Sequence, residues 1–130
     1  MMQNNILYLK KEIEKIKTLF IEKKFETIIK KIETLLKKNP NQAILYNLMG
    51  LSYLELDQCD KAIQVWLSAI EIIPSDPSIL CNIGIAYKKK MSYLEARKYF
   101  FLALKVNSKH LQSFVNLGNL ETELNNSKLA

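Results

Sequence analysis

Residues that end or bend regular structure are scarce in this sequence, which has only 3 glycines and 3 prolines among 130 residues. β-Sandwiches, β-barrels and flexible linkers need more of both, so these classes are excluded. The two cysteines, Cys59 and Cys81, are too few for a disulfide framework, and a single histidine leaves little for a metal site. We therefore expect neither a metal nor a cofactor.

Long hydrophobic runs are also missing. No apolar stretch approaches the ~20 residues that a membrane-spanning helix needs. The first residues show no basic stretch followed by an apolar block and a small-residue cleavage site, so we expect a cytoplasmic protein with no membrane partner. The hydrophobic content of 48% and the charged content of 25% are typical of one folded domain.

The net charge of +6 is spread unevenly along the chain. Residues 1–40 carry 10 lysines and 5 glutamates, residues 41–76 carry 1 lysine and 5 acids, and residues 77–110 carry 7 basic residues and 1 acid. Arg97 is the only arginine. Nucleic-acid binders more often carry one continuous basic stripe rich in arginine, so the pattern argues against nucleic acid as a partner.

An internal repeat of 34 residues dominates the sequence. The three glycines, Gly50, Gly84 and Gly118, are spaced by this period. Other pairs with the same spacing are Ala62 and Ala96, Ala69 and Ala103, Trp66 and Phe100, Tyr53 and Tyr87, and Pro40 and Pro74. So many coincidences at one period indicate a stack of equivalent structural units.

Each unit follows one pattern of large, small and aromatic residues. The first reads Tyr46-x-x-Met49-Gly50-x-x-Tyr53, Ala62-x-x-x-Trp66 and Pro74, and the second reads Leu80-x-x-Ile83-Gly84-x-x-Tyr87 and Ala96-x-x-x-Phe100. This pattern closely resembles the tetratricopeptide repeat (TPR). The resemblance implies an all-α fold, a right-handed superhelix of stacked antiparallel helical hairpins with about 3.5 repeats and seven helices. It also implies a protein-interaction module, a scaffold or chaperone-like adaptor, and not an enzyme.

The repeat predicts the organisation of the chain. We expect one domain over residues 1–130, with a degenerate repeat at 9–42, full repeats at 43–76 and 77–110, and a half repeat at 111–130 that is cut short where its second helix would begin. In the degenerate unit, Ile16 and Ile28 replace the glycine and the alanine. The apolar spacing predicts helices near 4–22, 24–38, 42–56, 59–72, 76–90, 93–106 and 110–124, with starting caps at Asp60, Ser75 or Asp76, and Ser92.

Small residues at fixed positions predict how each hairpin packs. We expect the glycine and the alanine to face each other where the two helices approach most closely, with large residues filling the wedges on either side. Stacking then completes the core, because one hairpin alone buries only one face.

The first helix carries an apolar stripe, which either packs on the second helix or serves a coiled-coil partner. The stripe consists of Ile6, Leu9, Ile13, Ile16 and Phe20.

The first helices of the units are expected to line an inner groove that binds a peptide or helix of another protein. Residues turned away from the glycine side of these helices face this groove. The candidate binding residues are Phe20, Ile44, Asn47, Leu48, Leu51, Leu54, Asn82, Ile85, Lys88, Lys89, Gln112, Asn116 and Asn119. The apolar half favours an apolar partner segment, unless the first helix folds over and fills it. The asparagines either clamp a peptide backbone or serve helix packing. The two lysines either dock acidic groups or form a solvated helix end.

Some tetratricopeptide domains grip the C-terminal carboxylate of a chaperone with a set of lysine, asparagine and arginine side chains. In this sequence only Asn82 falls on a matching position. Asn47, Leu51, Gln112 and Asn116 occupy the positions of the other clamp residues. The sequence therefore argues against chaperone-tail binding by that mechanism.

Catalysis finds no support in the sequence, and two further functions remain as alternatives. Cys81 is the only thiol predicted in the groove, His110 has no partner at a catalytic spacing, and no glycine-rich phosphate loop is present. One alternative is a self-assembling adaptor that oligomerises through its terminal helices, with Phe114 and Leu117 at the contact because their covering helix is missing. The other is a helical repeat that binds nucleic acid.

Overall fold

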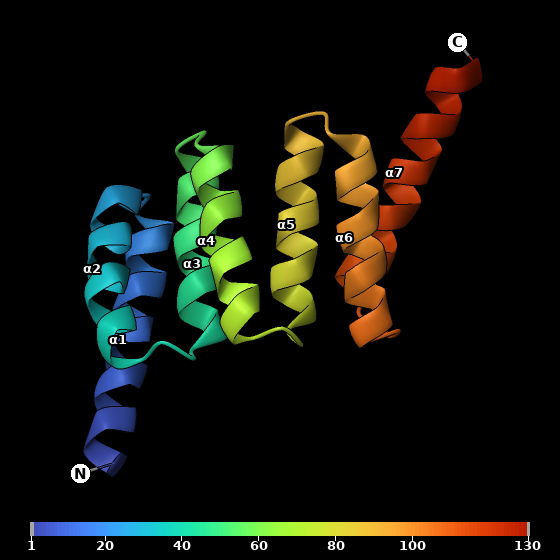
Figure 1. Cartoon of the computed structure of the whole chain (residues 1–130). Helices are drawn as coiled ribbons and strands as arrows, with labels where there is room; N and C mark the ends of the chain where they lie inside the picture. The colour runs from blue at the N-terminus through green and yellow to red at the C-terminus, as the bar shows by residue number, and fades with distance from the viewer. Residues whose placement is uncertain (1, 130) are drawn as a thin grey trace.

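The computed structural model describes the backbone of residues 2–129 and the side chains of residues 3–126. Over this range it has seven helices and no strand: α1 (Met2–Ile21), α2 (Phe25–Lys38), α3 (Ala43–Glu55), α4 (Cys59–Ile72), α5 (Pro77–Lys89), α6 (Tyr93–Val106) and α7 (Leu111–Leu129) (Figure 1). The expected all-α fold is confirmed. The helix bounds match the prediction within two residues, except that α7 continues beyond its expected end at residue 124.

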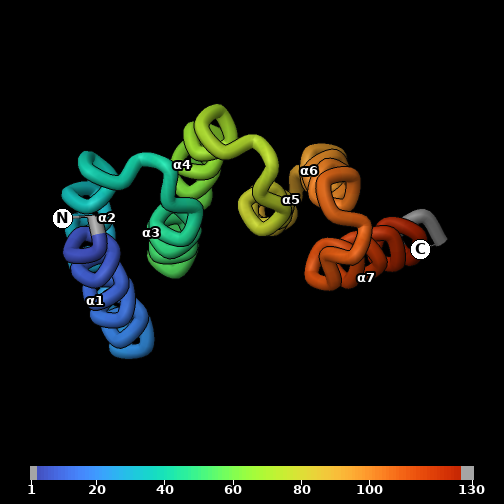
Figure 2. Tube along the Cα trace, turned by 90° about the horizontal axis from the view of Figure 1, so that it is seen from below, coloured from blue at the N-terminus to red at the C-terminus, as the bar shows by residue number. Residues whose placement is uncertain are grey.

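The helices alternate between two rows. Figure 2 shows α1, α3, α5 and α7 on the inner side of an arc and α2, α4 and α6 on its outer side. Each hairpin packs beside the next in chain order, so α1 and α7 stand at opposite ends of the inner row. Because α1 packs on α2 at its own end of the arc, it does not lie across α3 and α5, so the alternative in which the first helix folds over the apolar half does not occur in this structure.

The turn inside each hairpin has the same backbone conformation. Lys23, Asp57 and Met91 adopt left-handed φ values of 62°, 59° and 63°, although none of them is a glycine. The residue after each one donates its backbone N–H to a carbonyl five residues earlier, at 2.8–2.9 Å. This bond closes the end of the first helix in the manner of a Schellman motif. The three turns are 34 residues apart, so the repeat extends to the backbone geometry of the degenerate first unit.

The helix caps agree only in part with the expected residues. Asp76 caps α5, where its carboxylate accepts a hydrogen bond from the backbone N–H of Ile79 at 3.0 Å. Ser92 occupies the cap position of α6, but its side chain makes no capping bond. Asp60 is not the cap of α4 as predicted, because it lies in the first turn after Gln58, where its charge still suits the helix dipole.

The repeat glycines lie beneath aromatic side chains. A Cβ atom at Gly50 would overlap the indole of Trp66, and one at Gly84 would lie 2.6 Å from the ring of Phe100. Both aromatic residues are fully buried. The predicted glycine–alanine contact is therefore corrected, because the nearest atoms across each hairpin belong to the aromatic ring. The repeat alanines are buried in the same clusters.

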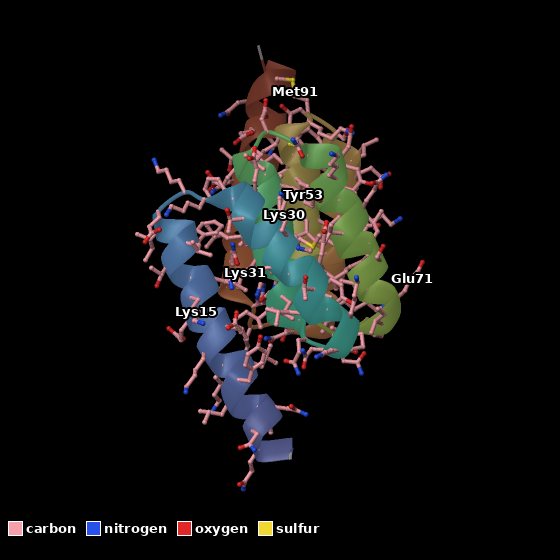
Figure 3. All side chains as sticks on the ribbon, turned by 90° about the vertical axis from the view of Figure 1, so that its left-hand side faces the viewer. Lys15, Lys30, Lys31, Tyr53, Glu71 and Met91 are labelled. Atoms are coloured by element: carbon pink, nitrogen blue, oxygen red, sulfur yellow. The ribbon has the colours of Figure 1, made fainter. Side chains whose placement is uncertain are left out.

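The degenerate first unit is held by apolar packing and by an ion pair between the buried Glu12 and two more exposed lysines. Ile16 and Ile28, which replace the small residues, are both fully buried. Beside them the carboxylate of Glu12 accepts hydrogen bonds from Lys31 at 3.0 Å and from Lys15 at 3.1 Å. Figure 3 shows Lys15 on α1 and Lys31 on α2, so the pair joins the two helices. The hydrogen bond from Lys31 lowers the pKa of Glu12, and the bond from Lys15 adds to this effect.

Candidate functional site

The inner row of helices presents one continuous face, which we call the inner surface. It is formed by α1, α3, α5 and α7, which lie on the inner side of the arc (Figure 2). The residues that define it are Phe20, Ile44, Asn47, Leu48, Leu51, Asn82, Ile85, Lys88, Lys89, Gln112, Asn116 and Asn119. These are twelve of the thirteen predicted binding residues, and their role in binding stays a prediction.

The first half of the inner surface is apolar. Ile44 is 37% exposed, whereas Leu48 and Leu51 are half-buried and pack against the core clusters. Phe20 is also half-buried, because its ring meets the edge of Phe25 at a centroid distance of 5.1 Å. This part of the surface therefore combines accessible apolar atoms with side chains that the core holds in place.

Leu54 is a correction to the predicted binding residues. It is only 7% exposed and belongs to the central core cluster together with Ile79, Ile83 and Ala86 of α5. Leu54 lies two helical turns after Asn47, on the edge of α3 that α5 covers. A substitution at this position would therefore disturb the core rather than the inner surface.

Amide side chains join the neighbouring helices of the inner row. Asn82 is 7% exposed and donates from Nδ2 to Oδ1 of Asn47 at 3.0 Å, which joins α5 to α3. One step further along, Nδ2 of Asn116 lies 3.9 Å from Sγ of Cys81 and donates to the backbone oxygen of Gln112 at 2.8 Å. Asn82 and Asn116 thus serve helix packing, which was one of the two roles considered for them. Other atoms of these amides remain available for a ligand.

A second polar cluster lies between α5 and α7, and the sequence did not reveal it. His110 bonds through Nδ1 to Oγ of the buried Ser113 at 2.6 Å, and its Nε2 lies 3.4 Å from Oγ of Ser78. The i, i+3 spacing of the histidine and Ser113 at the start of α7 was the available signal. Burial raises the pKa of the neighbouring Cys81 thiol, which keeps it protonated and makes it a poor nucleophile. The cluster joins α5 to the start of α7.

The basic segment at the end of α5 is partly neutralised by neighbouring acids. Lys88 pairs with Glu123 of α7 at 2.9 Å, and Lys90 pairs with Asp60 of α4. Lys89 is exposed. Of the two lysines predicted to bind acidic groups, Lys89 is directly accessible, whereas Lys88 is already engaged across the inner row.

The last helix divides its side chains between two sides. Leu117 packs against the cluster formed by α5 and α6, so only its partly exposed edge could reach a second molecule. Phe114 is 66% exposed. The exposed Gln112 and Asn119 complete the inner surface at this end.

Comparison with known proteins agrees with this architecture. A family model described as a TPR repeat matches residues 51–90. The protein contains tetratricopeptide repeats.

Among curated proteins, the anaphase-promoting complex subunit CDC16 of Saccharomyces cerevisiae is 29% identical over 89 residues, which are 63% of this chain and 11% of that protein. The peroxisomal targeting signal receptor of Candida glabrata is 26% identical over 83 residues, which are 64% of this chain and 14% of that protein. The chain thus spans a small part of both TPR-containing relatives.

Solved TPR domains share the fold over most of the chain. The first TPR of Spaghetti (RPAP3), bound to the HSP90 peptide SRMEEVD, superposes with a TM-score of 0.76 at 18% identity, and the match covers 85% of this chain and 88% of that one. The TPR domain of Sgt2 from Aspergillus fumigatus gives a TM-score of 0.81 at 13% identity, with coverage of 90% and 79%. The predicted TPR solenoid is confirmed at the level of the fold.

The described residues contain neither a candidate membrane span nor a candidate metal site. None of the helices between residues 2 and 129 combines the length and apolar character that crossing a membrane requires. Within the same range, histidine, cysteine, aspartate and glutamate side chains nowhere gather in a group of three or more that could hold a metal ion.

Proposed function

We propose that the inner surface binds a segment of another protein, as a helix or as an extended peptide. The observation that carries the proposal is the combination of accessible apolar atoms at Ile44, Leu48 and Leu51 with the amides of Asn47 and Asn82. Apolar atoms that remain accessible beside fixed polar groups are typical of a protein-binding surface. Peptide binding by TPR relatives supports the same class of function.

The amide pair offers both halves of a backbone clamp. After Asn82 donates to Asn47, the described residues provide no further partner for Nδ2 of Asn47 or for Oδ1 of Asn82. The first group can donate to a peptide carbonyl and the second can accept from a peptide N–H. Such contacts do not depend on the side chains of the ligand, so the apolar positions would supply the selectivity.

The lysines favour acidic groups in the ligand near the α5–α7 end. Lys89 is exposed and can pair with a carboxylate directly. Lys88 would have to exchange Glu123 for a carboxylate of the ligand, which would leave Glu123 without this partner. We therefore expect a partner segment with apolar side chains toward α3 and acidic side chains toward α7.

Chaperone tails are not the expected ligand. The first TPR of RPAP3 binds the HSP90 peptide SRMEEVD. In this chain, the resemblance places Asn47, Leu51, Gln112 and Asn116 where the clamp for such a tail needs its other groups, and none of these side chains carries a positive charge. We expect no saturable binding of SRMEEVD in a fluorescence anisotropy titration. Saturable binding that depends on Asn82 would contradict this expectation.

The proposal can be tested by comparing two double variants in affinity purification. Ile44→Asp with Asn47→Asp adds two charges to the inner surface, and an aspartate at position 47 can still accept the bond from Asn82. Ser68→Asp with Ile72→Asp is the matched control, because it likewise replaces one exposed isoleucine and one polar residue, on α4 of the outer row. Proteins retained by the wild type and by the control, but lost from the inner-surface variant, are the expected result.

The comparison can be interpreted only if both variants are folded. Circular dichroism must show that both variants remain helical, so that lost binding reflects the surface rather than the fold. If the inner-surface variant retains every partner of the wild type, the proposed binding surface is wrong. If the retained ligand is a nucleic acid whose affinity falls steeply with salt, the alternative of a nucleic-acid-binding repeat takes its place.

A further inference from the structure

The outer side of α7 is apolar and uncovered among the described residues. Leu111 is 72% exposed, Phe114 is 66% exposed and Val115 is 48% exposed. The opposite side of the same helix packs on α5 and α6 through the buried Ser113 and Leu120. Figure 1 shows α7 at the end of the stack, beside α6. Exposed apolar residues gathered on one helix side usually mark an interaction surface.

Gly118 lies on this exposed side and gives the surface a specific shape. A Cβ atom added there would meet nothing within 4 Å, whereas Gly50 and Gly84 are each covered by an aromatic ring. Phe114 precedes Gly118 by four residues, so the two lie next to each other on one side of the helix. In the hairpins α3–α4 and α5–α6, the glycine lies on the first helix and the aromatic residue that covers it lies on the second. In α7, the glycine and the aromatic residue lie on one side of the same helix.

The charged side chains of α7 itself are paired within the chain. Between residues 111 and 126 the only charged side chains are Glu121 and Glu123. Glu121 pairs with Arg97 of α6 at 2.6 Å, and Glu123 pairs with Lys88 of α5 at 2.9 Å. The net charge of +6 makes two copies of the chain repel each other at long range. α7 therefore adds no unpaired charge of its own to a contact between two copies.

We propose that a second copy of this chain docks on α7, with the two α7 helices packed antiparallel about a two-fold axis. An axis level with Asn116 places Phe114 of one copy opposite the partner's Gly118, and the reverse contact forms at the same time. Such a contact is self-complementary, as a two-fold dimer requires. It also reproduces between two chains the aromatic–glycine packing that each full hairpin shows internally. This surface is separate from the inner surface and does not depend on it.

The proposal predicts a weak dimer, because a single helix side buries little area. Sedimentation equilibrium of the wild type should show the 15.1 kDa monomer at low concentration and an average mass rising toward twice that value at high concentration. A range from about 10 µM to about 1 mM covers weak association. Phe114→Ala should hold the protein at the monomer mass throughout this range. A wild type that stays monomeric at the highest concentration overturns the proposal.

A pair of exchanged variants tests the aromatic–glycine contact itself. Phe114→Gly removes the ring from both contacts, and Gly118→Phe fills the space that the ring needs, so each variant alone should be monomeric. When the two are mixed in equal amounts, each contact again joins one phenylalanine and one glycine, and the dimer should return. Dimers formed by either variant alone, or no dimer in the mixture when the wild type dimerises, would contradict the proposed packing.

The folded state of these variants can be checked independently. Gly118→Phe has open space around it in the monomer, and α7 stays anchored by Leu120, so circular dichroism should remain helical. The inner-surface variant Ile44→Asp with Asn47→Asp should dimerise like the wild type. Loss of dimerisation in that variant would place the contact on the inner surface and would refute the α7 contact without affecting the proposed binding function.

Discussion

Adding one methyl group at each repeat glycine should give opposite effects along the chain. At Gly118 the added methyl group meets nothing within 4 Å, so Gly118→Ala gains only helix propensity, about 1 kcal/mol of stability. At Gly84 the same gain in helix propensity is opposed by steric overlap, because the added Cβ atom would lie 2.6 Å from the buried ring of Phe100. Overpacking of a core costs roughly 1–3 kcal/mol, so Gly84→Ala should be destabilising on balance. Gly50→Ala should cost more, because the added atom comes closer to the larger indole of Trp66.

Thermal and urea unfolding, followed by far-ultraviolet circular dichroism, can rank the three variants. A change of 1 kcal/mol shifts the melting midpoint of a domain of this size by about 4 °C. The measurement belongs at low micromolar concentration, where self-association through α7 does not contribute. We expect the midpoints in the order Gly118→Ala, wild type, Gly84→Ala and Gly50→Ala, from highest to lowest. If Gly118→Ala loses as much stability as Gly84→Ala in dilute solution, the description of α7 as an uncovered helix is wrong.

Two further predictions concern a turn and an ion pair. Met91 is 75% exposed and holds a left-handed φ of 63° (Figure 3). Glycine adopts this conformation without steric strain, so Met91→Gly should raise the stability by about 1 kcal/mol. An unchanged urea midpoint would show that the turn is not strained. The pKa of Glu12 is lowered in the folded state by its bond from Lys31. The unfolded chain therefore binds the proton more readily, and the stability that this carboxylate provides is lost as the pH falls below about 4.5. Glu12→Gln should lower the melting midpoint at neutral pH and reduce its dependence on pH between neutrality and acid; equal pH profiles for variant and wild type would exclude this role.

Much of the fold follows from the sequence because the repeat states each structural requirement more than once. Gly50 and Gly84 occur at one period, and so do Trp66 and Phe100, which is why the hairpins and the helix bounds could be predicted. The period does not show whether the aromatic ring covers the repeat glycine or the repeat alanine. That choice depends on the distance between two helix axes, and the Cβ positions at the glycines reveal it only in three dimensions.

The candidate site was harder to predict because adjacent inner helices are offset. Three contacts across the inner row join residues 35 positions apart rather than 34: Asn47 with Asn82, Cys81 with Asn116, and Lys88 with Glu123. A helical face drawn on one unit at a time cannot show this offset. It therefore left Leu54 on the inner surface, although α5 covers it, and it did not reveal that Lys88 is paired.

The end of α7 shows where local sequence preference gives way to packing. The left-handed turns at Lys23, Asp57 and Met91 recur every 34 residues, and the next position is Asn125. Asparagine adopts this conformation more readily than lysine or methionine does, so local sequence favours a turn there. The helix nevertheless continues to Leu129. In each earlier hairpin a second helix packs back across the first, whereas no described helix covers Gly118. A residue that favours the turn is therefore not sufficient to produce it.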